Sequence, residues 1–460
     1  MLEKFFELKK HGTTVRTEIV AGITTFVAMS YIIFVNPPML AMGNVQIQNG
    51  VFFATCIAAF IGTALMGLMA KLPFAQASGM GLNAFFAYTV MAGMGYSYNE
   101  VLAIVFISGM LFIAITIFGL REAIVRAIPK NIKIAISAGI GLFLALLGFK
   151  NAGIVVANSS TLVGLADFSA LAKGDQAAKL AVTGAVISIV GLVLIAALST
   201  LRVKGAILIG ILACTLLGVP FGVTVLPENF SVDFGVQFSD FMQYSLFQMD
   251  FAGLFAGSAN LLAAIGTIAM LVISFSLVDM FDTIGTLLGT AKKANLLDEN
   301  GNMPGMTKAL LCDAIATSAG AMLGTSTVTT YVESSAGVAE GGRTGLTACT
   351  TAVCFLLALV VAPFVSIVPA CATAPALIYV GGLMLSSVLD LETGEDMSEL
   401  IPAFLTIAMM PMTYSIANGI AFGLISYVLI KLLCGRWKEI NLITVIISAL
   451  FILRFFVIAM

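Results

Sequence analysis

Four acidic residues of this chain stand in sequence apolar enough to lie within a lipid bilayer. Asp279 and Asp282 belong to SFSLVDMFDTIGTLLGT, and Glu333 and Glu340 belong to GTSTVTTYVESSAGVAEGGRTG. A charged side chain at the bilayer centre costs about 2.5–3.5 kcal/mol even on scales derived from insertion, so such residues normally mark a binding site or a proton path. We therefore predict that residues 274–345 hold a functional site.

The two aspartates are candidates for proton transfer as well as for substrate contact. Asp279 and Asp282 are three residues apart, so a helix places both on one face. Two carboxylates placed that way repel each other, which favours protonation of one of them. The spacing leaves open which aspartate contacts substrate and which carries the proton.

Glu333 and Asn83 are the other candidates for substrate contact. An ionised carboxylate at Glu333 accepts two parallel N–H bonds, which guanine offers from N1 and its exocyclic amine. Asn83, in GMGLNA, can donate and accept, and would suit the other edge of a purine. The alternatives are a helix-packing hydrogen bond for Asn83 and a salt bridge to Arg343 for Glu333.

Composition restricts the class of protein. Of the 460 residues 60% are hydrophobic and only 10% are charged, whereas soluble domains carry about 25% charged residues. The seven cysteines form no CxxC pair, and His11 is the only histidine. A zinc site, a histidine relay and a histidine-based catalytic triad are therefore excluded, and we expect neither an enzyme nor a bound cofactor. The scattered basic residues also indicate no nucleic-acid partner.

Apolar segments long enough to enter a membrane recur along the whole chain, about fourteen or fifteen in number. They are predicted at 19–40, 51–71, 79–93, 100–120, 133–149, 179–200, 203–220, 261–290, 307–324, 333–342, 344–370, 373–389, 399–415, 416–433 and 440–457. The last of these is either an extra span or a helix lying in the membrane interface.

Two of these segments are short and interrupted by small residues. They run from Phe74 to Val90 and from Thr329 to Gly345, and each is the third segment of its half if the chain divides near 221–250. Paired short, glycine-interrupted segments are typical of inverted-repeat transporters with a midplane site. We therefore predict an all-α polytopic membrane protein in which two strand and half-helix segments meet at mid-membrane. A pair of ordinary kinked helices is the alternative.

Basic residues predict the orientation. They fall in alternate short loops, at residues 4–16, 71, 121–133, 202–204, 292–293 and 343. The positive-inside rule then places residues 1–18 in the cytoplasm and the connection 221–260 outside the cell. The pattern weakens at the acidic segment 390–399, DLETGEDMSE, because this count places it in the cytoplasm. Lys431, Arg436 and Lys438 recover the cytoplasmic side if residues 399–433 cross the membrane twice.

Several strings resemble those of the AzgA-like purine permeases, a branch of the nucleobase–cation symporter family that also holds uracil and xanthine permeases. They are AGITTFVAMSYIIFVNP, ASGMGLNAFFAYTV, FDTIGTLLG, GTSTVTTYVESSAGVAEGGRTGLTA and PAFLTIAMMPMTYSIANGIAFGLISYV. The resemblance covers nearly the whole chain. It implies about fourteen spans as two inverted repeats of seven, divided into a core domain (19–120 and 261–370) and a gate domain (121–220 and 371–460).

The resemblance also implies a function. Such permeases, found in the cell membrane and often dimeric, carry adenine, guanine and hypoxanthine, usually with protons as the coupling ion. By motif, Glu333 and Asn83 match the binding residues of the tenth and third segments, and the eighth-segment acid is either Asp279 or Asp282. Because adenine lacks the N1–H of guanine and hypoxanthine, these two are favoured as substrates. The alternatives are a transporter of xanthine, uracil or another small solute, and a channel.

Overall fold

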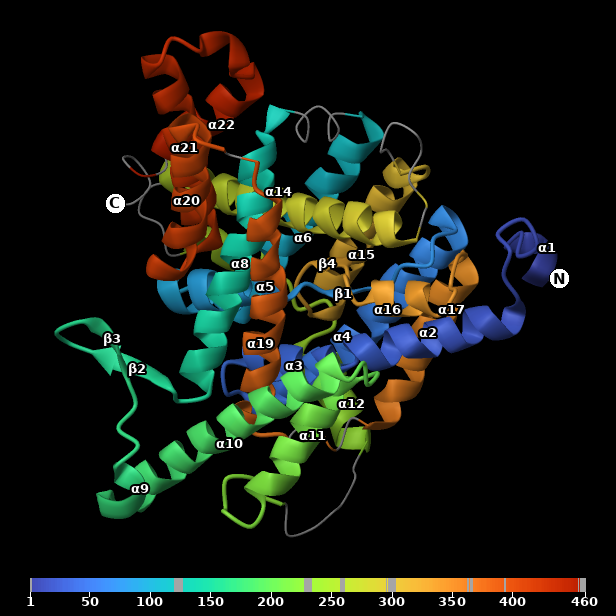
Figure 1. The fold of residues 1–460 in the computed structure, drawn as a ribbon, viewed down its shortest axis with the longest axis vertical. Coiled ribbons are helices and arrows are strands. Elements are labelled where there is room, and N and C mark those ends of the chain that lie inside the picture. Colours follow the sequence, from blue (N-terminus) through green and yellow to red (C-terminus); the bar gives the residue numbers. More distant parts are fainter. Residues whose placement is uncertain are drawn as a thin grey trace.

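A computed structural model describes residues 2–119, 127–226, 234–256, 261–294, 296, 303–361, 364, 367–392, 394–453 and 455. In this part of the chain, helices follow the predicted apolar segments in order (Figure 1). Eight are long and apolar enough to cross a membrane, at Val15–Ala41, Val45–Ala70, Tyr98–Ile117, Lys130–Asn151, Gln176–Thr200, Ala264–Leu287, Ala370–Asp390 and Ile416–Leu433. The predicted class, a helical polytopic membrane protein, is confirmed. Arg121 and Arg126, which entered the orientation argument, lie outside the described residues, as do the side chains of Lys292 and Lys293.

One group of helices surrounds the two central strands. In its first half the chain forms α2 (Val15–Met29), α3 (Ile32–Ala41), α4 (Val45–Leu65), β1 (Gln76–Ser78), α5 (Met80–Ala84) and α6 (Tyr98–Ile117). In its second half it forms α14 (Leu261–Lys293), α15 (Met306–Leu323), β4 (Val328–Thr330), α16 (Ser334–Ala339) and α17 (Gly345–Leu357). Helix α17 packs against α2 and α4, and α15 packs against α4 and α6. If α2 and α3 are taken as the two parts of one span, Val15–Ala41, the same order of elements occurs twice, and its two copies pack together.

The remaining long helices form a second group. Its members are α8 (Lys130–Asn151), α10 (Gln176–Thr200), α11 (Ala206–Gly218), α19 (Ala370–Leu385), α20 (Met397–Met412), α21 (Ile416–Leu433) and α22 (Leu442–Leu453). Helix α8 packs against α19, α20 and α21, while α10 and α11 pack against α19. Between α8 and α10 a hairpin of β2 (Val155–Asn158) and β3 (Leu162–Leu165) projects from the molecule (Figure 1). The two groups meet where α8 touches α5 and α14.

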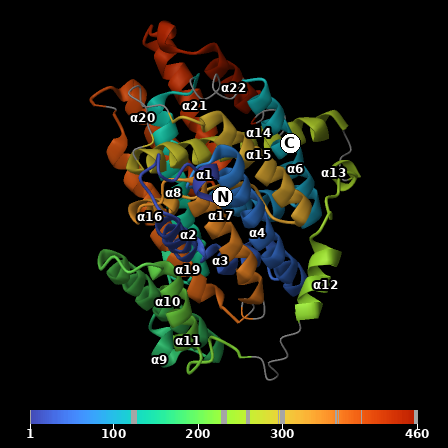
Figure 2. The same cartoon turned by 90° about the vertical axis from the view of Figure 1, so that its right-hand side faces the viewer.

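Smaller helices lie at the N-terminus, before α10 and between the two halves. They are α1 (Leu2–Phe5), α9 (Ala170–Lys173), α12 (Phe234–Tyr244) and α13 (Gly253–Ala256). Helix α12 stands at the edge of the molecule beside α4 (Figure 2). The rings of Phe53 and Phe241 stack there with their centroids 5.7 Å apart. The connection between the halves is thus partly helical and packed onto the first group.

Local sequence explains why each strand stands between two helices. Gly324 has a φ of 100° and ends α15, and the β-branched run Thr325–Thr330 that follows favours extended backbone. In the first half, Pro73 precedes β1 and Gly79 precedes α5. Helices α4 and α5 are each continued by a π-helix, at Met66–Ala70 and Phe85–Gly93. Each predicted short segment is therefore a strand followed by a half-helix.

The acidic segment 390–399 is paired in part with basic residues from other elements. Four salt bridges hold it, namely Lys130–Glu392 at 2.6 Å, Lys431–Asp396 at 3.9 Å, Lys431–Glu399 at 3.0 Å and Arg436–Asp396 at 2.6 Å. Hydrogen bonds from Ser398, together with the Arg436 guanidinium, lower the pKa of Asp396 to about 2. The segment therefore lies at the same end of the second group as Lys130 and Arg436.

Helix α22 is the described part of the predicted segment 440–457. Its 12 residues rise about 18 Å, less than the roughly 30 Å hydrocarbon core of a bilayer. It packs against α21, and the Thr444 hydroxyl donates to the Ala127 carbonyl at 2.6 Å. A crossing segment and an interfacial helix both remain predictions for this stretch.

Candidate functional site

The candidate site is built around the antiparallel pair of β1 and β4, near the middle of the molecule (Figure 1). Gln76 pairs with Thr330 and Ser78 with Val328. The bonds continue on both sides, because the Gly79 amide donates to the Thr327 carbonyl and the Tyr331 amide to the Ala75 carbonyl, each at 3.0 Å. Strands and half-helices from the two repeats are thus fixed to one another by the backbone.

Glu333 lies between β4 and α16, where it is partly exposed. The Tyr31 hydroxyl, from the turn between α2 and α3, donates to its carboxylate at 2.7 Å. The alternative of a salt bridge to Arg343 is not formed, because that guanidinium donates to the carbonyls of Val338 and Gly342 at 2.6 and 2.8 Å. A tyrosine therefore fixes the Glu333 carboxylate, which no cation neutralises in the described part of the chain.

Asp279 is fully buried against β4. The Thr317 hydroxyl lies 3.3 Å from its carboxylate and 3.2 Å from the Val328 carbonyl. The same hydroxyl accepts a hydrogen bond from the Val328 amide at 3.1 Å. Asp279 thus belongs to the contacts that hold β4 on α14 and α15.

Asp313 is also fully buried and joins both strands to the helices. Its carboxylate accepts a hydrogen bond from the Thr283 hydroxyl at 2.7 Å and a long one from the Gln76 amide at 3.5 Å. Thr283 is bonded in turn to Thr329 of β4 at 2.7 Å. The structure therefore gives Asp313 a structural contact with β1.

Asp282 differs from both of these aspartates, because its side chain is partly exposed. No described residue donates a hydrogen bond to its carboxylate. Its charged neighbours are Glu333 and Asp313, and it also acts electrostatically on the hydroxyls of Tyr31 and Tyr331. Asp279 and Asp282 thus differ in solvent exposure, although helical spacing alone gave no reason to distinguish them.

Asn83 is fully buried on α5. Its side-chain oxygen accepts a hydrogen bond from the Ser326 hydroxyl, and its Nδ2 has no acceptor among the described residues. No hydrogen bond joins Asn83 to Glu333 there. The amide N–H groups of Asn83 therefore lie beside the strands without an acceptor among the described residues, on a different half-helix from the carboxylate.

Two residues of the site region escaped the sequence analysis. Tyr31 stands in an apolar run, and its contact with Glu333 spans 302 positions of the chain. Glu18, at the start of α2, is fully buried, and its carboxylate accepts hydrogen bonds from residues 343–347. A polar side chain in an apolar segment was the only signal available for Tyr31. Glu18 stands in VRTEIV, within residues 1–18 that were predicted to lie in the cytoplasm, so its acidic side chain gave no signal.

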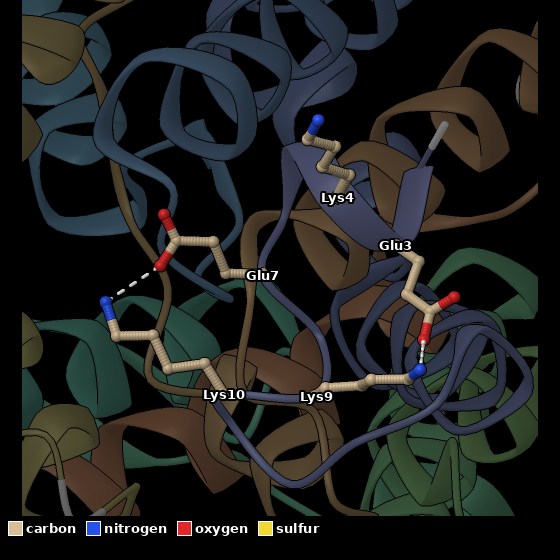
Figure 3. Close-up of a pocket in the computed structure, with 5 residues that line it drawn as sticks. All are labelled: Glu3, Lys4, Glu7, Lys9 and Lys10. Carbon is tan, nitrogen blue, oxygen red and sulfur yellow. Dashed lines mark hydrogen bonds and ion pairs between the residues drawn. The ribbon is translucent and has the colours of Figure 1, made fainter.

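A hollow at the N-terminal surface is unrelated to these residues. It is lined by Glu3, Lys4, Glu7, Lys9 and Lys10 (Figure 3). Two exposed salt bridges occupy it, Lys9–Glu3 at 3.4 Å and Lys10–Glu7 at 2.8 Å. Four of its five charged side chains are already paired, so the strand crossing remains the candidate site.

Comparison with known proteins identifies the family to which this chain belongs. The model of a family described as the permease family (Xan_ur_permease) matches residues 16–422. The chain belongs to this family. It is therefore a membrane transporter and not an enzyme, as the sequence predicted.

Relatives identify the branch of the family. Adenine permease AdeQ of Escherichia coli K12 is 42% identical over 454 residues, which cover 98% of this chain and 96% of the relative. Guanine/hypoxanthine permease PbuO of Bacillus subtilis 168 is 40% identical over 467 residues, which cover 98% and 100%. The predicted resemblance to purine permeases is confirmed.

Solved structures show the same fold at much lower identity. The transmembrane domain of a cyanobacterium bicarbonate transporter, BicA, aligns with a TM-score of 0.62 and 13% identity, covering 88% of this chain and 96% of that one. The SLC26A9 structure aligns with a TM-score of 0.61 and 10% identity, covering 91% and 66%. These matches support an inverted-repeat transporter fold and say nothing about the transported solute.

Proposed function

We propose that this permease imports purine nucleobases by proton symport, with guanine and hypoxanthine favoured and adenine as a further substrate. The proposal rests on the partly exposed Glu333 carboxylate at the junction of β4 and α16, which no cation among the described residues neutralises. The relatives named adenine permease and guanine/hypoxanthine permease support the purine class.

Hydrogen-bond geometry accounts for the preferred substrates. Guanine presents two parallel N–H groups and hypoxanthine one, both of which suit an ionised carboxylate at Glu333. Adenine has no N1–H and needs either a protonated Glu333 or another pose. The buried Nδ2 of Asn83, for which no described residue is an acceptor, would donate to another edge of the ring.

Asp282 is the better candidate for the proton carrier. It is partly exposed next to Glu333, whereas Asp279 is buried against Thr317. One proton crossing 100 mV yields about 2.3 kcal/mol, enough for roughly 50-fold accumulation at 1.36 kcal/mol per tenfold. No cofactor is needed for this coupling.

The two packing groups provide the moving parts. We assign the core domain to the helices around β1 and β4, and the gate domain to the group of α8, α10, α11 and α19–α22. Rocking of one group against the other would expose Glu333 alternately to the two sides of the cell membrane. The basic loops favour a cytoplasmic N-terminus.

Uptake in cells lacking their own purine transporters tests the proposal. Labelled hypoxanthine is challenged with adenine, guanine, xanthine and uracil at two pH values. We expect competition by guanine and adenine, and uptake that an uncoupler abolishes. Competition by uracil or xanthine alone would instead support another nucleobase as substrate, and accumulation that survives the uncoupler would exclude proton symport.

Two substitutions then test the site. Glu333→Gln is expected to abolish guanine uptake while the protein stays in the membrane, and Glu395→Gln, at an exposed position, should leave uptake unchanged. Asp282→Asn should still exchange purine across the membrane but not concentrate it. Near-normal uptake by the first variant, or uphill accumulation by the second, would refute the respective assignment.

A further inference from the structure

We infer that Tyr31 is a positioning residue that sets the selectivity among purines, by fixing the plane of the Glu333 carboxylate. This inference rests on the proposed function and goes beyond it, because it makes a residue of the first helix pair responsible for the preference for guanine. Tyr31 belongs to neither of the short segments that carry the site in the sequence.

The position of Tyr31 is rigid. It stands in the turn between α2 and α3 and is only 1% exposed. Its carbonyl accepts hydrogen bonds from the amides of Phe34 and Val35 at 3.0 and 3.1 Å, which anchor its backbone to the start of α3. The phenol reaches Oε1 of Glu333 from this fixed base, at 2.7 Å.

Within the described residues, Tyr31 is the one side chain that donates to the Glu333 carboxylate. Arg343 donates to backbone carbonyls, and the neighbouring Tyr331 hydroxyl donates to the Ser78 carbonyl at 2.5 Å. The terminal torsion of a glutamate side chain is broad. Without the Tyr31 hydrogen bond, only the backbone amide of Glu333 itself would hold the carboxylate among the described residues, so its plane would rotate over a wider range.

The orientation of this plane matters more to one purine than to another. Guanine needs both carboxylate oxygens in line with two parallel N–H groups, and Tyr31 uses only one of the two lone pairs of Oε1. Hypoxanthine has a single N1–H, which one oxygen can accept over a wide range of carboxylate rotation. Fixing the plane therefore favours guanine.

The test replaces Tyr31 by phenylalanine, which keeps the ring and removes only the hydroxyl. We expect KM for guanine to rise about tenfold and KM for hypoxanthine less than threefold, the size of effect typical for a hydrogen bond to a charged group. Tyr379→Phe is the matched control, because its hydroxyl contacts Ser199 in the other helix group. That variant should change neither constant.

A second measurement separates this role from a general loss of folding. Guanine and hypoxanthine should each stabilise the purified protein, and the ligand-induced rise in Tm is compared between variants present at equal amounts. In a Glu333→Ala background, which removes the acceptor of the Tyr31 hydroxyl, Tyr31→Phe should not change the Tm of the ligand-free protein or any hypoxanthine effect that remains.

The outcomes are distinct. Equal changes for both purines, or none, in a Tyr31→Phe protein present at normal amounts would overturn the role of Tyr31 and leave the proposed function standing. An effect of Tyr31→Phe on the remaining hypoxanthine effect or on the ligand-free Tm in the Glu333→Ala background would show that Tyr31 acts elsewhere. Absence of any purine uptake by the unmodified protein would overturn the proposed function, and this inference with it.

Discussion

Glu18 is predicted to hold the loop behind the candidate site in place. Its carboxylate is fully buried, and Oε1 accepts a hydrogen bond from the Arg343 amide at 2.9 Å. Oε2 accepts from the hydroxyls of Thr344 and Thr347 at 2.9 and 2.6 Å, and from the Thr347 amide at 3.1 Å. These bonds tie α2 to the start of α17, immediately after the half-helix α16 that follows Glu333.

Replacing Glu18 by glutamine keeps the size of the side chain and halves its accepting capacity. If the amide oxygen faces the two threonines, the amide NH₂ faces the Arg343 N–H, so one bond is lost and one buried donor is left without an acceptor. The remaining bonds also lose the assistance of the charge. We expect a loss of about 2–4 kcal/mol from these terms.

Thermal unfolding of the detergent-solubilised protein measures this effect. Glu18→Gln should lower Tm by several degrees, and Glu395→Gln, an exposed substitution of the same type, should leave it within experimental scatter. Equal Tm values for the two variants would refute the reasoning, because they would show that the buried carboxylate contributes no more than an exposed one.

Two further predictions concern contacts around α16 and α17. The Lys204–Glu340 ion pair, 2.9 Å long, joins the two helix groups; reversing either charge should slow initial uptake by up to about fivefold, the limit for an exposed pair, and reversing both should restore it. If the double reversal does not restore the initial uptake rate, the loss in the single variants does not come from breaking this ion pair. A Cβ at Gly345 would lie 1.9 Å from the Gly67 carbonyl oxygen, so Gly345→Ala should lower Tm, whereas Gly382→Ala, where no atom lies within 4 Å, should not. An unchanged Tm for the first variant would mean that α17 can shift without cost.

The fold and the central crossing could be predicted because their signals are local. Glycines and β-branched residues interrupt two apolar segments, and the structure shows a strand and a half-helix at each, in β1–α5 and β4–α16. That the two short segments meet could also be predicted, because each is the third segment of its half. Neither prediction required knowledge of a side-chain contact.

The contacts of the site depend on tertiary structure and could not be predicted from the sequence. Helical spacing puts Asp279 and Asp282 on one face. Of the two aspartates, however, only Asp279 accepts a hydrogen bond from the hydroxyl of Thr317 on α15. Tyr31 reaches Glu333 across 302 positions, and Glu18 reaches Thr347 across 329. Side chains from distant elements therefore determine that Asp279 is buried and hydrogen-bonded, whereas Asp282 is partly exposed.

The acidic segment 390–399 shows that an orientation prediction from loop charges must include the basic residues that pair with the loop from other elements. Asp396 precedes α20, and its salt-bridge partner Arg436 follows α21. The outer ends of this helix pair therefore lie together, and the chain between them must run out and back. If α20 and α21 cross the membrane, they cross it as a hairpin, so residues 390–399 and the basic residues after α21 lie on one side. The acidic segment is thus compatible with the cytoplasmic side, because the basic residues paired with it, Lys130, Lys431 and Arg436, lie at the same surface and satisfy the positive-inside rule there.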